Sequence, residues 1–246
     1  MGLSDCDEVR ELWKGAGFTI VNNVNEVFMK LDPQGLLVAQ DQDSGKIIGY
    51  CGAVNVAEDF AVIGGYCVKP EYQGHGIGNN IWNSGMAHMG DRNIGLTAAN
   101  TKMLEIYRDR HHFKCIREPI LYMRGELALD RDLIDYIKGV SLVAINEHNV
   151  RDVCEYDRQV CGLDRSVMIE GFYQTADNSQ KLTNVEKYAC WQFIVSTTTT
   201  NHKAIQLAKK LGLSEGMEQM AGYTKVIPQT NVAKMYSLGS TMFYVL

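Results

Sequence analysis

Ala61–Gly85, AVIGGYCVKPEYQGHGIGNNIWNSG, combines a strand, a glycine turn and a helix in one run. Ala61–Val68 is short, mostly apolar and rich in β-formers, which predicts a buried strand that Pro70 ends. Gln73–Gly78 then carries three glycines at alternate positions, and an amphipathic run begins at Ile81. The stretch therefore predicts that a buried strand passes through a glycine turn into a helix.

The glycine turn is suited to an anion. A helix N-terminus presents unpaired N–H groups and the positive end of the helix dipole, and glycine lets the backbone approach a ligand closely. Pyrophosphate is such an anion. The alternative is that Gly74, Gly76 and Gly78 only make a tight strand-to-helix turn. No Gly-Lys-Ser/Thr follows, and the third glycine is wrongly spaced for the dinucleotide fingerprint.

The turn resembles motif A of the GNAT superfamily of N-acetyltransferases, Q/R-x-x-G-x-G/A, at Gln73, Gly76 and Gly78. In that family the loop amides hold the pyrophosphate of acetyl-CoA, the co-substrate, and the preceding strand lines its pantetheine and thioester. The resemblance implies a set of acetyl-CoA-binding residues: Tyr66, Cys67, Val68, Gln73, Gly74, His75, Gly76, Ile77, Gly78, Asn79 and Asn100.

The elements around this stretch predict an α/β fold with a mixed sheet, of α+β type. Hydrophobic patterning gives short helices at Asp5–Trp13 and Asn25–Leu31, a hairpin from Gly35–Gln40 and Lys46–Ala57, a strand at Asn93–Ala99, a helix at Thr101–Asp109 and two strands within Phe113–Glu126. The order is similar to that of the GNAT acyl-CoA N-acyltransferase fold, except that the usual first strand is missing before Asp5.

The second half begins with a predicted connecting helix. Further elements are expected as follows: this helix at Asp130–Lys138, a strand at Val140–Ile145, helices around Val150–Val160 and Ser166–Tyr173, and a polar loop at Gln174–Lys187. We expect a GNAT N-acetyltransferase domain at residues 1–128 and a smaller, degenerate or incomplete GNAT-like unit at residues 139–246.

An internal repeat supports the second unit. Asn100–Tyr107 and Asn201–Ala208 both read N-x-x-(A/M)-x-x-(I/L)-(Y/A). Each opens a predicted helix and follows a predicted strand, which is Trp191–Ser196 for the second copy. Both are similar to motif B of the GNAT family, N-x-x-A-x-x-L-Y-x-x-x-G-F. The second copy has Ala208 where the first has Tyr107, and no Gln-x-x-Gly-x-Gly precedes it. Loss of coenzyme binding is therefore expected in the second unit.

Amine acetylation needs a neutral amine, a stabilised oxyanion and a protonated leaving thiolate. The resemblance implies that Tyr107 protonates the thiolate and that a strand amide near Tyr66–Val68 stabilises the oxyanion. The alternative for Tyr107 is a half-buried core aromatic. Glu58 and Asp59 are candidate bases acting through water, although solvated turn acids are the simpler interpretation.

Two other groups are expected to be structural. Cys67 lies beside the expected thioester but has no adjacent cation to activate it, so we expect a packing role. His111 and His112 have no third ligand nearby, and no metal site is expected.

Composition limits the function further. The 246 residues are 46% hydrophobic with a net charge of −5, which argues against nucleic-acid binding. No apolar run approaches a membrane span, and the first residues do not resemble a signal peptide. Seven cysteines without C-x-x-C pairs indicate free thiols and a cytoplasmic, or nuclear, location.

The resulting prediction is an N-acetyltransferase that moves acetyl from acetyl-CoA to a primary amine. The acceptor is a small-molecule or protein amine, and no nucleic acid or membrane is expected as a partner. The alternative is a non-catalytic acyl-CoA-binding or interaction protein with a degenerate GNAT fold.

Overall fold

The structure is a computed structural model and describes residues 1–18, 23–126, 145–175, 192–231 and 234. Its helices are η1 (Leu3–Asp5), α1 (Cys6–Gly15), α2 (Val24–Leu31), η2 (Pro70–Tyr72), α3 (Ile77–Met89), α4 (Thr101–His111), α6 (Val150–Cys161), α7 (Ser166–Thr175) and α8 (His202–Lys210). Its strands are β1 (Leu36–Gln40), β2 (Ile47–Asn55), β3 (Phe60–Val68), β4 (Asn93–Ala98), β5 (Cys115–Ile116), β6 (Ile120–Glu126), β7 (Gln192–Thr198) and β8 (Ser214–Tyr223).

One open sheet carries all these strands, in the order β1-β2-β3-β4-β8-β6-β7, with β5 paired to β8 off this path. The β3–β4 pair is parallel and the other pairs are antiparallel. The predicted α/β fold with a mixed sheet is therefore confirmed. The predicted helices and strands of the first half are present, with ends that shift by a few residues.

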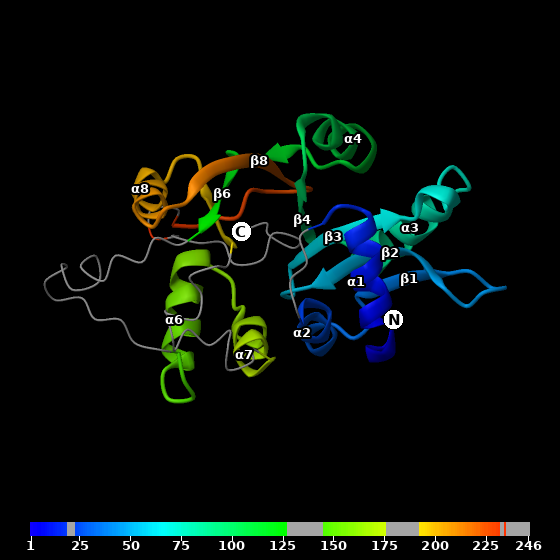
Figure 1. The fold of residues 1–246 in the computed structure, drawn as a ribbon, viewed down its shortest axis with the longest axis horizontal. Coiled ribbons are helices and arrows are strands. Elements are labelled where there is room, and N and C mark those ends of the chain that lie inside the picture. Colours follow the sequence, from blue (N-terminus) through cyan, green and yellow to red (C-terminus); the bar gives the residue numbers. More distant parts are fainter. Residues whose placement is uncertain (19–22, 127–144, 176–191, 232–233, 235–246) are drawn as a thin grey trace, which may run out of the picture.

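Helices cover both faces of the sheet (Figure 1). On one face α1, α2 and α6 pack against β2, β3 and β6 through a core that includes Trp13, Phe28 and Tyr50. On the other face α3 and α4 pack against β3 and β4 around Ile63 and Trp82, and α8 packs against β6. The sheet is thus buried on both sides, which explains the nearly continuous apolar run of β2.

Strand β8 crosses from the second half of the sequence into the first half of the sheet. It is hydrogen-bonded to β4 on one side and to β6 on the other. Residues 214–223, SEGMEQMAGY, are polar at the start and were not predicted as a strand. The division into residues 1–128 and 139–246 stays a prediction, and the sheet is continuous across it.

In the second half, α6, α7, β7 and α8 lie where helices and a strand were predicted. The expected helix at Asp130–Lys138 and the polar loop from residue 176 onward lie outside the described residues, as does the expected strand at Val140–Ile145 apart from its last residue.

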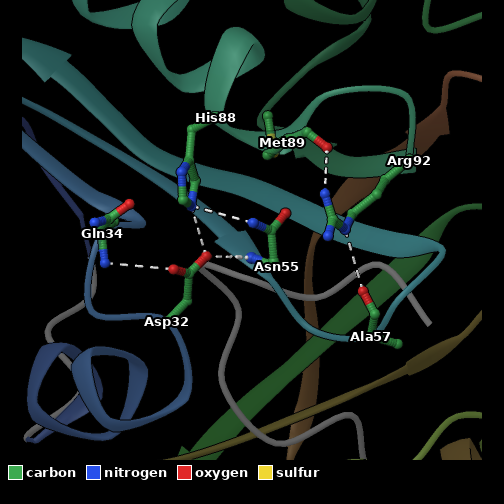
Figure 2. Close-up of polar contacts among 7 residues, drawn as sticks. All are labelled: Asp32, Gln34, Asn55, Ala57, His88, Met89 and Arg92. Atoms are coloured by element: carbon green, nitrogen blue, oxygen red, sulfur yellow. Dashed lines mark hydrogen bonds and ion pairs between the residues drawn. The ribbon is translucent and has the colours of Figure 1, made fainter.

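Asp32, at the end of α2, fixes the C-terminal half of α3 against the sheet (Figure 2). Its Oδ2 lies 2.8 Å from His88 Nε2 and accepts a hydrogen bond of 2.8 Å from the Asn55 amide. Arg92, just beyond α3, donates to the carbonyls of Met89 and Ala57 at 2.9 and 3.3 Å. These contacts hold the far end of α3, and so its N-terminus, in one position beside β3.

Among the described residues, no helix is both long enough and apolar enough to cross a membrane. The six cysteines in this part of the chain are free thiols.

Candidate functional site

A β-bulge in β3 shapes the site. Tyr50 pairs with Cys67 and Gly52 pairs with Gly64, so Gly65 and Tyr66 together oppose one residue of β2. Gly65 has φ +63, and a Cβ there would lie 2.9 Å from Tyr50 Cε1. Its carbonyl accepts a 3.0 Å hydrogen bond from Trp13 Nε1 of α1. Glycine is therefore required at 65, and α1 holds the bulge in place.

Just before the bulge, β3 and β4 separate. Their pairing ends at Val62 and Gly95, yet β3 continues to Val68 and β4 to Ala98. The unpaired ends of these two parallel strands form a wedge. Backbone groups that a neighbouring strand would have bonded are available there to a ligand.

The glycine turn joins the end of β3 to α3. Gly74 and Gly76 both have φ +80, the left-handed region that glycine adopts readily, and Gly76 is the N-cap of α3. The Gln73 side chain donates a 2.9 Å hydrogen bond to the Val68 carbonyl and so ties the turn to the strand. Within the part of the chain that the structure describes, no side-chain hydrogen bond caps the N-terminus of α3. Its first N–H groups remain available at the positive end of the helix dipole.

The turn faces a large cleft of about 1030 Å³, which we call the outer cleft. Eight of the predicted coenzyme-binding residues line it: Tyr66, Cys67, Val68, Gln73, Gly74, Gly76, Gly78 and Asn79. Its wall also contains two cations, Lys46 and Lys69, and three carboxylates, Glu8, Glu11 and Glu71, the first two of which come from α1. The outer cleft therefore combines the uncapped amides of the turn with side chains of both charges.

Three predicted residues are absent from that wall. His75 is exposed, and its Nδ1 lies 2.9 Å from the Gln73 carbonyl oxygen. Ile77 is half-buried at the start of α3. Asn100 caps α4, where its Oδ1 accepts a 2.9 Å hydrogen bond from the Met103 amide.

A second cavity of about 340 Å³, which we call the inner pocket, reaches into the β3–β4 wedge. Its wall includes Gly64 and Gly65 of the bulge, Thr97 of β4 and Arg124 of β6. Tyr66, Met103 and Tyr107 line both cavities, as do Ala16 and Phe18 beyond α1. The two cavities thus lie on either side of a shared wall that contains both tyrosines.

That wall is an aromatic cluster built on Trp82 of α3. Trp82 stacks on Tyr107 with ring centroids 5.3 Å apart and meets Tyr66 edge-on at the same separation. Burial, together with the nearby Tyr66, raises the pKa of Tyr107 to about 12. At neutral pH Tyr107 therefore carries its proton, as a general acid must.

The other residues considered for catalysis do not have the environment that catalysis would need. Burial raises the pKa of Cys67 to about 12, which keeps it a thiol and a poor nucleophile. Glu58 and Asp59 are exposed at the β2–β3 turn and line neither cavity. In the described part of the chain, no group of three or more His, Cys, Asp or Glu side chains could hold a metal ion.

The two repeats play the same local role. Asn201 caps α8 as Asn100 caps α4, with its Oδ1 accepting a 3.1 Å hydrogen bond from the Ala204 amide. Each helix follows a strand of the shared sheet, β7 and β4 respectively. In the first repeat Tyr107 lines the cavities, whereas Ala208 in the second repeat is buried against β6.

Sequence reasoning missed several residues of the site. Gly64-Gly65 inside an apolar strand is a recognised sign of a bulge and could have indicated this one. The pocket positions of Arg124, Met217 and Gln219 had no such signal, because they depend on how β6 and β8 pair.

Residues 6–113 match the model of the acetyltransferase (GNAT) family, and no sequence among curated proteins matches the chain. The fold is similar to that of a Pyrococcus horikoshii protein assigned as an acetyltransferase, with a TM-score of 0.70 and 16% identity over 98% of this chain and 93% of that one. A tandem GNAT protein from the clavulanic acid biosynthesis pathway gives a TM-score of 0.56 and 14% identity, over 91% and 96%.

A GCN5-related N-acetyltransferase from Sphaerobacter thermophilus gives a TM-score of 0.52 and 12% identity, over 89% of this chain and 92% of that one. At identities of 12–16%, these similarities establish the fold alone. The family assignment comes from the model that matches residues 6–113. Residues 6–113 therefore match a GNAT acetyltransferase domain.

Proposed function

We propose that the protein is an N-acetyltransferase that moves an acetyl group from acetyl-CoA to a primary amine by direct attack on the thioester. The observation that carries this proposal is the uncapped N-terminus of α3, with Gly76 as N-cap, on the wall of the outer cleft. Its amides and the helix dipole suit a diphosphate.

Acetyl-CoA fits this cleft on chemical grounds. The turn provides donors without side chains in the way, because a Cβ at Gly74 or Gly76 would meet no protein atom within 4 Å. The cleft also runs along Tyr66–Val68. The extended pantetheine arm of acetyl-CoA, with its thioester, would therefore lie beside the unpaired ends of β3 and β4.

In the proposed reaction the amine nitrogen attacks the thioester carbonyl carbon, and the C–S bond then breaks with its electron pair left on sulfur. A backbone amide near Tyr66–Val68 donates to the oxyanion. Tyr107 gives its proton to the sulfur and regains one from water. The amine loses its proton to solvent, because among the described residues the inner pocket has no carboxylate or imidazole in its wall.

Cys67 is assigned a packing role in this proposal, and acetyl is not passed through it. The second unit is proposed to be a degenerate GNAT-like unit that supports the first without binding coenzyme. The six free thiols of the described residues are compatible with a cytoplasmic location, which we include as part of the proposal.

Tyr107→Phe tests the reaction. We expect this variant to bind acetyl-CoA like the wild type and to release CoA thiol at least about 100-fold more slowly, because only the proton donor is lost. Equal turnover would remove Tyr107 from the mechanism. Tight binding of acetyl-CoA without thiol release, across a panel of amines in the wild type, would instead support the non-catalytic acyl-CoA-binding alternative.

A further inference from the structure

The inner pocket has one charged side chain in its wall, as far as the described residues go, and it is a cation. That side chain is Arg124 on β6. The remaining wall is made of glycine, apolar and neutral polar residues, among them Thr97 and Gln219. An acceptor that carries only positive charge would meet no carboxylate there, whereas an anionic group would meet a guanidinium.

Strand geometry explains why Arg124 faces this pocket. Tyr122 lies in the core beneath α1 and α2, and Met123 packs on the opposite face against α8. Because side chains alternate along a strand, Arg124 shares the face of Tyr122. Gly216 of β8 lies beside it, since a Cβ there would be in ordinary contact with Arg124 Nε at 3.8 Å.

Two acidic residues of β8 lie on the other face of the strand pair. Glu215 is in register with Met123 and Glu218 with Leu121, so both acids share the face that packs on α8. Glu215 is paired there with Lys209 of α8 at 2.5 Å. These two acids of β8 therefore lie on the opposite face of the strand pair from Arg124.

We propose that the acetyl acceptor is a small aminocarboxylate, with its carboxylate bound by the Arg124 guanidinium and its amine directed toward the β3–β4 wedge. This inference rests on the proposed function. The planar guanidinium can bind a carboxylate through two parallel hydrogen bonds, which fixes the orientation of the molecule as well as its affinity. A cavity of about 340 Å³ suits a molecule of that size.

The separation between amine and carboxylate is also constrained. In the sheet order β3-β4-β8-β6, three strand spacings separate the wedge strand from the strand of Arg124. These amount to roughly 14 Å, part of which the arginine side chain spans. Aminocarboxylates with several carbons between their two groups should therefore be better acceptors than glycine.

The test compares three acceptors with their decarboxylated counterparts: glycine with methylamine, 4-aminobutyrate with propylamine, and 6-aminohexanoate with pentylamine. Acetyl transfer is measured as CoA thiol release in the full-length protein, for the wild type, Arg124→Gln and Arg124→Lys. Arg151→Gln is the matched control, because it removes the same charge from an exposed position on α6 outside both cavities.

In the wild type and in Arg151→Gln, we expect at least one aminocarboxylate to exceed its matched alkylamine by about tenfold or more in kcat/KM. Arg124→Gln should abolish that preference, and Arg124→Lys should retain part of it. Equal use of both members of every pair would overturn the inference, and so would a preference that survives in Arg124→Gln.

The experiment distinguishes failure of this acceptor inference from failure of the proposed function. If alkylamines are acetylated and aminocarboxylates are not, the enzyme assignment stands and the acceptor inference is wrong. If nothing is acetylated, calorimetric titration of 6-aminohexanoate and pentylamine into the CoA-bound protein gives the answer. Binding of the aminocarboxylate that Arg124→Gln removes supports the anion site, and no binding rejects it.

Discussion

Gly78 has no room for a side chain. A Cβ at this position would lie 2.3 Å from the Tyr66 hydroxyl, and Tyr66 is held edge-on against Trp82. The backbone at Gly78 is ordinary α-helix, so the requirement for glycine comes from this close approach alone. The third glycine of the turn therefore serves to bring α3 against the tyrosine between the two cavities.

Gly78→Ala should lower the free energy of unfolding by about 1–3 kcal/mol, because Tyr66 must move to admit the methyl group. It should also weaken acetyl-CoA binding, since Tyr66 lines the outer cleft. Urea unfolding and calorimetric titration measure the two effects. Adding Tyr66→Phe, which removes the colliding oxygen, should restore part of the stability; a double variant no better than Gly78→Ala would contradict the steric explanation.

The pH dependence follows from the groups in the pocket. An amine attacks only when neutral, so below its own pKa kcat/KM should rise with pH and follow the pKa of the acceptor. The pKa of Tyr107, raised to about 12, keeps the acid protonated across this range, so no decline is expected below about pH 10. The check is a set of profiles with acceptors of different pKa. A plateau near pH 7 common to all of them would indicate an enzymatic base.

Among the helices and strands, β3 has the largest effect on the shape of the site. The bulge at Gly65 turns the strand, and pairing with β4 ends just before it, so the wedge and the bulge belong together. Trp13 of α1 fixes the bulge by its hydrogen bond to the Gly65 carbonyl. The N-terminal helix thus contributes to the shape of a site whose motif lies more than fifty residues later in the chain.

Gly65→Ala should lower the free energy of unfolding by at least about 2 kcal/mol. Alanine adopts the left-handed backbone of residue 65 only at a cost, and its Cβ would lie 2.9 Å from Tyr50 Cε1. Gly15→Ala is the control for stability. A Cβ at Gly15, the last residue of α1, meets no atom within 4 Å, so little change is expected. Chemical denaturation of both variants is the measurement, and equal stabilities would show that the bulge does not require glycine.

Local sequence patterns were sufficient to predict the glycine turn and the strand and helix that flank it. Gln73–Gly78 and the apolar strand before it are contiguous, and hydrophobic period and glycine spacing specify both. The same reasoning identified the motif B asparagines, which prove to be helix caps. It did not identify β8, because that polar segment becomes a strand through its partners β4 and β6, which are distant in sequence.

At the scale of the whole molecule, β8 makes the two halves of the chain interdependent. It brings residues 214–223 between β4 and β6, and its Met217 and Gln219 line the inner pocket. Tyr223 and Ala221 of the same strand are buried in the core with α1 and α2. The inner pocket therefore depends on the second half, although the motif that suggested the function lies in the first.

A fragment of residues 1–128 should not fold as a stable domain. Without β8, strand β4 would expose a bare edge and the buried ring of Tyr223 would leave a cavity in the core. We expect the fragment to aggregate or to unfold without a cooperative transition, as followed by circular dichroism. A cooperative transition with the midpoint of the full chain would contradict this account of β8.

The central claim is that the glycine turn at the start of α3 binds the diphosphate of acetyl-CoA. Gly76→Val puts a side chain among the free amides, and Gly45→Val is the control, with a similar φ of +67 in a turn outside both cavities.

The measurement is the rise in Tm with saturating acetyl-CoA. For the wild type and Gly45→Val we predict roughly 5–10 °C, and for Gly76→Val no rise. A wild-type protein without a shift at millimolar acetyl-CoA, or a Gly76→Val variant that keeps the full shift, would contradict the claim.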